Sequence, residues 1–155
     1  MMKYIAYIAT FLALFSCSSD DDICISGEAT PRMKLKFKES EGRLLRLARI
    51  IVDVDYGNGT KTVVDATSVD SIMIPLRVDN QLFTEVFVRT SETGTASKIK
   101  VNYTTEAQYV SPACGFKKLY KNVSPTLETT NPVKSIETLQ TEIIDEKGTH
   151  LFLVF

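Results

Sequence analysis

The sequence of 155 residues has no tryptophan and only one histidine, His150. A Ser-His-Asp triad would depend on His150, and the Gly-x-Ser-x-Gly pattern of a nucleophile elbow does not occur. His150 stands at the entry to the last apolar segment, where a structural or surface histidine is expected. The lack of tryptophan argues weakly against a carbohydrate site built on indole stacking, for which tyrosine or phenylalanine would have to substitute.

The chain also lacks a basic block and a calcium-binding loop. Lys and Arg number 18 against 19 Asp and Glu, so nucleic acid is not an expected partner. Asp53 and Asp55 before Gly57 invite a calcium interpretation, but the fifth position from Asp53 is Gly57 and the twelfth is Val64. An EF-hand needs Asp or Asn and Glu there. We expect a strand end and a hairpin turn at residues 57–59; a shallow surface calcium site stays open.

The N-terminal apolar run is too short to cross a membrane. Residues 4–15 are apolar except for Thr10, whereas a spanning helix needs about 20 residues. Lys3 precedes the run and the small residue Ser16 follows it, which completes the three parts of a secretory signal. We therefore expect residues 1–16 to be a cleaved signal peptide.

A cysteine follows this signal directly. Leu14-Phe15-Ser16-Cys17 resembles a bacterial lipobox, although Phe15 is larger than the pattern prefers. The resemblance implies cleavage before Cys17, a diacylglycerol on its sulfur and an acylated amine; the alternative is an ordinary cleavage site with a chance cysteine. Two or three acyl chains anchor a protein stably, whereas one binds marginally. We expect Cys17 to attach the chain to the membrane.

An acidic stretch comes next and resembles the surface-export signal of Bacteroidota lipoproteins. It consists of Ser18, Ser19, Asp20, Asp21 and Asp22. The resemblance implies a place on the outer face of the outer membrane. The alternative is a solvated tether, extended by charge repulsion, on a protein that faces the periplasm. We expect a lipidated acidic tether over residues 17–23 and a single domain over residues 24–155.

Two cysteines remain once Cys17 carries lipid. Cys24 and Cys114 would lie in an oxidising compartment, and an even pair is the number expected for one disulfide bridge. That bridge would close a loop of about 91 residues and contribute at most about 4–5 kcal/mol. The alternative is two buried free thiols. Two cysteines with His150 do not complete a structural zinc site, so neither a metal nor another cofactor is expected.

Most of the chain alternates between apolar and polar residues with the period of a β-strand. Strands are expected at residues 33–38, 50–56, 71–76, 83–89, 98–110, 115–120 and 151–155, with weaker ones at 61–64, 133–137 and 142–144. Residues 43–49 suit a brief helix, and the polar residues 65–70 suit a loop. Pro75 cannot donate a ladder hydrogen bond, so residues 71–76 should lie at a sheet edge or end there.

About seven to nine short strands separated by turn residues predict an all-β fold, an antiparallel β-sandwich. An immunoglobulin domain would have a tryptophan on its disulfide and a tyrosine two residues before the second cysteine. Here tryptophan is absent and Tyr109 lies five residues before Cys114, so the architecture is immunoglobulin-like at most. The alternative is a small β-barrel.

Ser71 follows Asp70 and precedes Ile72. This triplet resembles the short Asp-Ser/Thr-apolar acceptor of protein O-glycosylation in Bacteroidota, so Ser71 is a candidate for modification. A serine that simply begins a strand is the alternative.

Four segments are similar to those of one family: residues 20–24, 71–79, 111–116 and 127–129. Through them the chain resembles a family of small Bacteroidota lipoproteins whose domain has no known function. The resemblance covers nearly the whole mature chain, and the pair of cysteines is its most specific part. It implies location and size, and no activity comes with it.

These observations favour a non-enzymatic lipoprotein of the cell envelope. We expect an accessory or binding module that is lipid-anchored at the outer membrane and binds an outer-membrane protein or a glycan. The alternative is a small hydrolase with an unrecognised acidic site that uses Asp53, Asp55 or Glu128. A purely structural envelope protein is a third interpretation.

Overall fold

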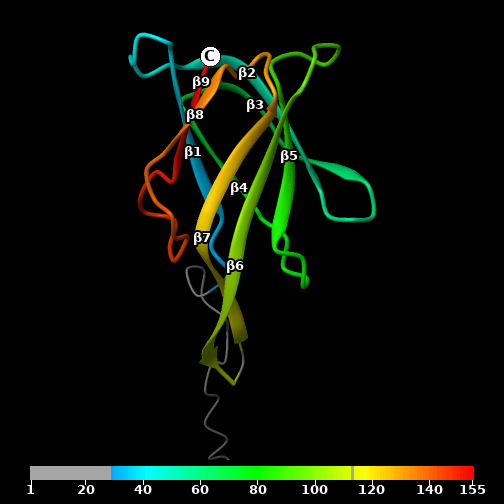
Figure 1. Ribbon diagram of the computed structural model, residues 1–155, viewed down its shortest axis with the longest axis vertical. Helices are drawn as coiled ribbons and strands as arrows, with labels where there is room; N and C mark the ends of the chain where they lie inside the picture. The colour runs from blue at the N-terminus through cyan, green and yellow to red at the C-terminus, as the bar shows by residue number, and fades with distance from the viewer. Residues whose placement is uncertain (1–28, 113) are drawn as a thin grey trace, which may run out of the picture.

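The computed structural model describes residues 29–112 and 114–155, and this part of the chain consists of nine strands joined by turns and loops (Figure 1). The strands are β1 (Met33–Lys38), β2 (Leu47–Asp55), β3 (Thr60–Val69), β4 (Ser71–Ile74), β5 (Phe83–Arg89), β6 (Ser97–Ser111), β7 (Gly115–Thr129), β8 (Ser135–Thr138) and β9 (Leu151–Val154). Among the described residues, no helix has the length and apolarity needed to cross a membrane.

The strands form two sheets. One has the order β4-β1-β9-β8 and the other the order β3-β2-β5-β6-β7. Neighbours are antiparallel except β1 and β9, which pair in parallel with Leu35 opposite Leu151. Both sheets are open, with β4 and β8 at the edges of the first and β3 and β7 at the edges of the second. This arrangement confirms the predicted β-sandwich over its closed alternative.

The core lies between the sheets and is built by the alternation that the sequence shows. On β1 the side chains of Met33, Leu35 and Phe37 are at most 1% exposed, whereas the lysines between them are half-buried. On β6 the inner face carries Ile99 and Val101, also buried. Burying an aliphatic or phenylalanine side chain stabilises a fold by about 1.5–3 kcal/mol, so these faces hold the sheets together.

The two longest strands continue beyond the sandwich as a two-stranded ribbon (Figure 1). We define the ribbon as residues 104–111 of β6 and 115–121 of β7, which pair from Thr104–Lys121 to Ser111–Gly115. The register shifts between Asn102 and Thr104, where the ribbon starts. Such a bulge bends and twists a strand, which turns the ribbon away from the packed sheet.

Two sequence-based predictions of local structure are wrong. Residues 65–70 are not a loop, because β3 continues to Val69 and pairs Asp65 with Ile51. β3 is an edge strand with mostly exposed side chains, so its polar composition does not prevent pairing with apolar β2. Residues 43–49 are not helical: Leu44 forms a bridge with Lys38, and β2 begins at Leu47.

Other predictions for strand ends hold. β4 is an edge strand, and Pro75 follows its last residue. The C-terminal strand β9 lies between β1 and β8. His150 extends its pairing with β1, because the His150 backbone N–H donates to Lys34 O at 2.9 Å and the Lys34 N–H donates to His150 Nδ1 at 2.8 Å. His150 is 1% exposed, which confirms a structural role.

Candidate functional site

The described chain enters the sandwich at the end from which the ribbon projects (Figure 1). We call this the entry end; residues 29–32 lead into β1 there. The Lys118 N–H on the ribbon donates to the Thr30 hydroxyl at 3.0 Å. Arg32 forms a bidentate ion pair with Glu146 at 2.8 Å, which lowers the pKa of that carboxyl to about 2. The segment before β1 is therefore fixed against both the ribbon and residues 144–147.

A cavity of about 530 Å³ lies between the entry segment and the loop before β9. Its lining residues are Ala29, Thr30, Pro31, Arg32, Ile144, Asp145, Glu146 and Lys147. Two of the charged lining residues, Arg32 and Glu146, form an ion pair with each other. The cavity is a groove between the entry segment and residues 144–147, and its lining residues do not indicate which ligand would bind there.

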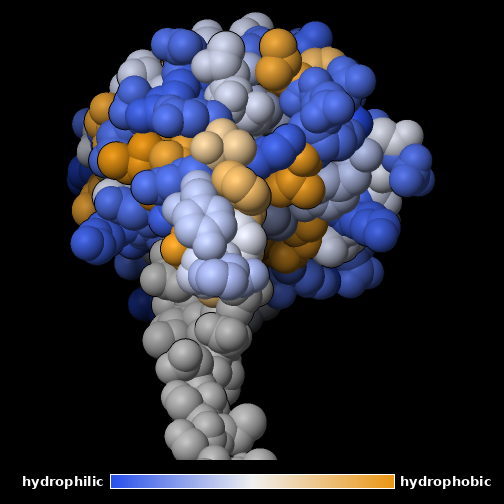
Figure 2. All heavy atoms as spheres, turned by 90° about the horizontal axis from the view of Figure 1, so that it is seen from below, coloured by the Kyte–Doolittle hydropathy of each residue, from blue (hydrophilic) through white to orange (hydrophobic). Residues whose placement is uncertain are grey.

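Exposed apolar side chains gather at the entry end. Of seven large hydrophobic side chains that are exposed among the described residues, five lie on the ribbon, on residues 75–82 or beside the entry segment: Val78, Leu82, Tyr109, Phe116 and Ile144. Figure 2 looks at this end and shows apolar patches beside hydrophilic ones. A mixed surface of this kind is typical of an interaction site.

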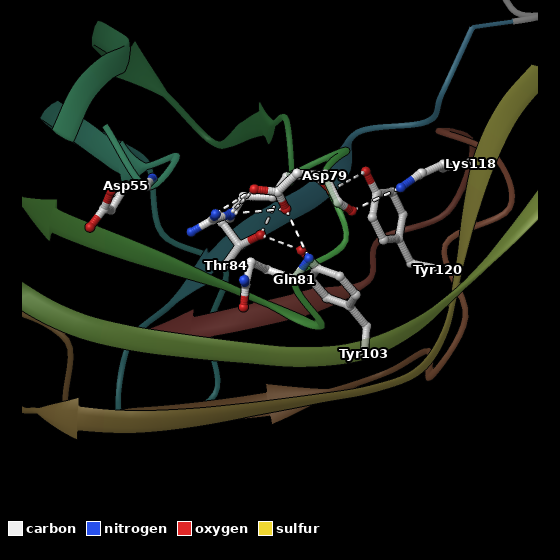
Figure 3. A network of polar contacts seen from close by, with 9 residues as sticks. Asp55, Asp79, Gln81, Thr84, Tyr103, Lys118 and Tyr120 are labelled. Carbon is white, nitrogen blue, oxygen red and sulfur yellow. Dashed lines mark hydrogen bonds and ion pairs between the residues drawn. The ribbon is translucent and has the colours of Figure 1, made fainter. Parts of the chain in front are cut away.

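The loop that crosses between the sheets is held by buried polar groups. Residues 75–82 connect β4 in one sheet to β5 in the other. The Arg77 N–H donates to Thr84 Oγ1 at 3.0 Å, and the same hydroxyl lies 2.7 Å from the Tyr103 hydroxyl (Figure 3). Thr84 is fully buried, so both bonds satisfy groups that water cannot reach.

Two further tyrosines fix the carbonyls of this crossover loop. The Tyr120 hydroxyl donates to Arg77 O at 3.2 Å (Figure 3), and the Tyr56 hydroxyl donates to Pro75 O at 3.2 Å. Burial raises the pKa of all three phenols, those of Tyr56, Tyr103 and Tyr120, because it disfavours the phenolate. Tyr56 and Tyr120 donate hydrogen bonds to the loop, and Tyr103 shares one with Thr84.

The Arg77 side chain completes the network. It is 11% exposed and forms an ion pair with Asp79, whose pKa it lowers chiefly through that hydrogen bond. Lys118 Nζ donates to Asp79 O at 2.8 Å, which ties the loop to the ribbon (Figure 3). With its backbone fixed in this way, the loop presents Val78 and Leu82 to solvent, 60% and 54% exposed.

The comparisons with known proteins bear on this part of the chain. A family model described as "Family of unknown function (DUF6452)" matches residues 50–155. The chain belongs to this family. The match includes the crossover loop, the whole ribbon and strands β3 to β9, whereas β1 and the entry segment precede it. No curated protein and no solved structure matches the chain.

The carboxylates of the hydrolase alternative lie on two separate strands of the DUF6452 domain, Asp53 and Asp55 on β2 and Glu128 on β7. Asp53 Oδ2 accepts from Arg89 at 2.5 Å and its Oδ1 accepts from the Thr62 hydroxyl, whereas Glu128 pairs with Lys98 at 3.0 Å. β2 and β7 are three strand spacings apart, or about 14 Å. Asp55 Oδ1 accepts from the Gly57 N–H at 2.7 Å at the start of the hairpin turn. Glu128 therefore lies far from Asp53, and each of the three carboxylates already has a polar partner.

The glycine-rich segment after Asp55 is the predicted strand end and hairpin turn. β2 ends at Asp55 and β3 begins at Thr60, and Gly57 and Gly59 both have positive φ. Within residues 29–112 and 114–155, no three His, Cys, Asp or Glu side chains are placed to hold a metal ion.

The other predicted site residues divide between the described and undescribed parts. Ser71 is the first residue of β4, half-buried, and its hydroxyl donates to Asp70 at 2.9 Å. Cys114 lies in the turn at the tip of the ribbon, where its N–H donates to the Ser111 hydroxyl at 3.1 Å. Cys17, the export signal of residues 18–22 and Cys24 lie outside the described residues. The crossover-loop network is the part of the site that sequence reasoning missed.

Proposed function

We propose that this DUF6452 protein is a lipid-anchored module of the cell envelope that works by binding rather than by catalysis. The observation that carries the proposal is the position of the entry segment. It joins the domain at the end that presents exposed apolar side chains, twelve residues after the lipobox cysteine. Twelve residues extend at most about 40 Å, so an anchor at Cys17 would keep the entry end near the membrane.

The acidic tether bears on which face of the outer membrane holds the domain. Residues 18–22 are similar to a surface-export signal, so we propose the outer face, with an outer-membrane protein or a glycan as the binding partner. A periplasm-facing accessory subunit is the alternative within the same proposal.

The proposed Cys24–Cys114 bridge would join the tether to the ribbon. Cys114 lies in the turn at the ribbon tip, so the bridge would leave only residues 18–23 as a free leash. Six extended residues reach about 20 Å. Non-reducing mass spectrometry of the mature protein should then find a linked peptide, and double substitution by serine should lower the free energy of unfolding by about 2–5 kcal/mol. Two freely alkylating thiols would contradict the bridge.

Fractionation tests the anchor. Cys17→Ala should block lipidation and release the protein from the membrane fraction, and inhibition of the lipoprotein signal peptidase should trap the precursor. Unchanged fractionation of the variant would end the proposal. Changing Asp20, Asp21 and Asp22 to alanine should keep the lipid but reduce protease accessibility on whole cells; unaltered accessibility would favour the periplasmic face.

Binding is favoured over the hydrolase alternative because Glu128 lies far from Asp53, and because Asp53 and Asp55 already accept hydrogen bonds from neighbouring groups. Asp53 and Glu128 belong to different ion pairs, on strands about 14 Å apart, whereas general acid–base catalysis needs both groups at one substrate. Crosslinking of the lipidated protein in intact cells, followed by purification, should recover an envelope protein or glycan in defined proportion. Recovery of the module alone would leave binding without support.

A further inference from the structure

The ribbon tip carries an exposed pair of aromatic side chains. Tyr109 on β6 lies directly opposite Phe116 on β7, and their rings meet edge to face with centroids 5.4 Å apart. Tyr109 is 55% exposed and Phe116 is 70% exposed, the highest value among the large hydrophobic side chains of the described residues. The pair is preformed, so presenting it to a partner requires no rearrangement of the ribbon.

Lysines stand just behind this pair. Lys118 lies two residues from Phe116 toward the sandwich, on the same face of the strand, because side chains of a strand alternate between faces. Its ammonium group donates to Asp79 O. Lys117 lies on the opposite face and makes no ion pair within the described part of the chain. Aromatic rings at the end of an element, with Lys117 one step behind, match the order of a membrane interface, where rings lie at headgroup level and lysines reach toward phosphates.

The chain before residue 29 indicates which surface this tip meets. The Lys118 N–H donates to Thr30 on the entry segment, and Lys118 is two residues, or about 7 Å, from Phe116. A lipid on Cys17 would therefore be held within about 40 Å of the entry segment that contacts the ribbon, and tethering raises the effective concentration of a weak contact.

We propose that the tip of the ribbon, with Tyr109 and Phe116 leading, docks into the headgroup region of the lipid surface to which the chain is anchored. The inference rests on the proposed lipid anchor and deepens it by naming a second contact with the membrane. The contact would set the orientation of the domain, with the far end of β1 directed away from the membrane.

The absence of tryptophan makes a direct test possible, because one introduced indole is the only tryptophan of the chain and can be excited apart from the tyrosines. Phe116→Trp is the reporter. Leu44→Trp is the matched control, since Leu44 is 67% exposed and follows the far end of β1. Each variant of the mature lipidated protein is bound to phosphatidylcholine vesicles, with and without phosphatidylglycerol. Quenching of the indole by lipids brominated along the acyl chain then measures its contact with the bilayer.

We expect strong quenching and a blue shift for Phe116→Trp and neither for Leu44→Trp. Equal quenching of both indoles, or no quenching of the Phe116→Trp indole on vesicle-bound protein, would overturn the inference. A concentration-dependent blue shift without vesicles would also overturn it, because it would show that a second copy of the chain covers the tip.

A non-lipidated form separates this inference from the anchor. The chain from residue 18 onward, held on nickel-chelating vesicles by an N-terminal polyhistidine tag, should show the same quenching pattern even if Cys17 proves not to be lipidated. In the same form without the tag, Lys117→Gln should weaken partition into anionic vesicles about fivefold, the effect of one basic residue near such a surface. An unchanged partition would show that Lys117 does not face the headgroups, contrary to the proposed orientation.

Discussion

The hydroxyl groups of Thr84 and Tyr103 lie 2.7 Å apart in the interior of the sandwich, on adjacent strands β5 and β6. The Thr84 hydroxyl also accepts the Arg77 N–H from the crossover loop. One threonine thus joins two strands to the loop that connects the sheets. The Lys118 Nζ bond to Asp79 O joins the same loop to the ribbon, so Val78, Leu82 and Phe116 are presented at one end of the domain.

Removing this shared hydroxyl should be costly. Thr84→Val keeps the size of the side chain but leaves the Arg77 N–H and the Tyr103 hydroxyl without their partner. We expect the free energy of unfolding to fall by about 1–3 kcal/mol, because a buried polar group left unsatisfied costs that much. Urea unfolding measures it. Thr84→Ser, which retains the hydroxyl, should lose less; equal losses would show that the methyl group and not the hydrogen bonds matters.

His150 should make stability depend on pH. Burial lowers its pKa, and its Nδ1 accepts the Lys34 N–H, so the folded state holds the neutral ring. The unfolded histidine protonates near pH 6.5. Between the lower pKa of the folded state and about pH 6.5, the unfolded state binds more protons than the folded state, so stability rises with pH. The contribution of His150 to the free energy of unfolding is therefore complete above about pH 6.5 and is lost as the pH falls toward the folded pKa. Urea unfolding from pH 7.5 to 5 should show the decline.

The control is His150→Asn, whose amide oxygen can take the place of Nδ1 but does not titrate. This variant should be less stable than the natural protein at neutral pH, yet its stability should change little between pH 7.5 and 5. Because the chain has one histidine, NMR titration of its ring reports the folded pKa without an assignment problem. A ring that titrates at its ordinary value would contradict the burial argument.

Glu146 should act at lower pH. Its pKa in the folded state is about 2, chiefly through the hydrogen bonds from Arg32. A carboxyl group with a lowered pKa stabilises the fold when the pH is above its pKa in the unfolded state, near 4.3. This contribution is lost as the pH falls toward 2. Glu146→Gln should reduce stability at pH 7 by less than about 1 kcal/mol, because the pair is partly exposed, and the difference should vanish near pH 2. Glu41→Gln, at a carboxylate 80% exposed, should have almost no effect at either pH.

The sequence predicted those parts of the fold that a local pattern encodes. On β6, alternation from Lys98 onward placed Ile99, Val101 and Tyr103 on one face, and all three are buried. For residues 65–70 the same rule failed, because the apolar residues there, Ala66 and Val69, are only half-buried and do not alternate with a period of two. The pairing of this edge strand is decided by its neighbour β2, which no local window contains.

The crossover-loop network could not be predicted, because it joins residues far apart in the chain. Tyr120 and Arg77 are 43 residues apart, and nothing near either residue indicates the contact. A weak signal existed in β5: Thr84 shares the period of Val86 and Val88, which predicts that it faces inward, whereas Phe83 and Phe87 lie on the outer face beneath lysines. Hydrophobicity alone would place Phe83 and Phe87 in the core, whereas the alternation along β5 places Thr84 there. The structure agrees with the alternation, because Thr84 is fully buried.

Gly57 and Gly59 offer a matched test of how the hairpin turn supports the crossover loop. Both have positive φ, 90° and 97°, so alanine at either position should cost about 1–2 kcal/mol for the left-handed backbone alone. A Cβ at Gly59 would meet nothing within 4 Å, whereas a Cβ at Gly57 would lie 2.8 Å from Arg77 Nη2. Arg77 would have to leave its position beside Asp79.

We therefore expect Gly57→Ala to lower the free energy of unfolding by about 1 kcal/mol more than Gly59→Ala, the net value of one hydrogen bond. Thermal and urea unfolding of both variants measure the difference. In an Arg77→Ala background the difference should disappear, because the displaced guanidinium is no longer present. If the two glycine substitutions cost the same in the natural sequence, the turn and the crossover loop are energetically independent, and the Arg77–Asp79 pair alone does not hold the loop against the sandwich.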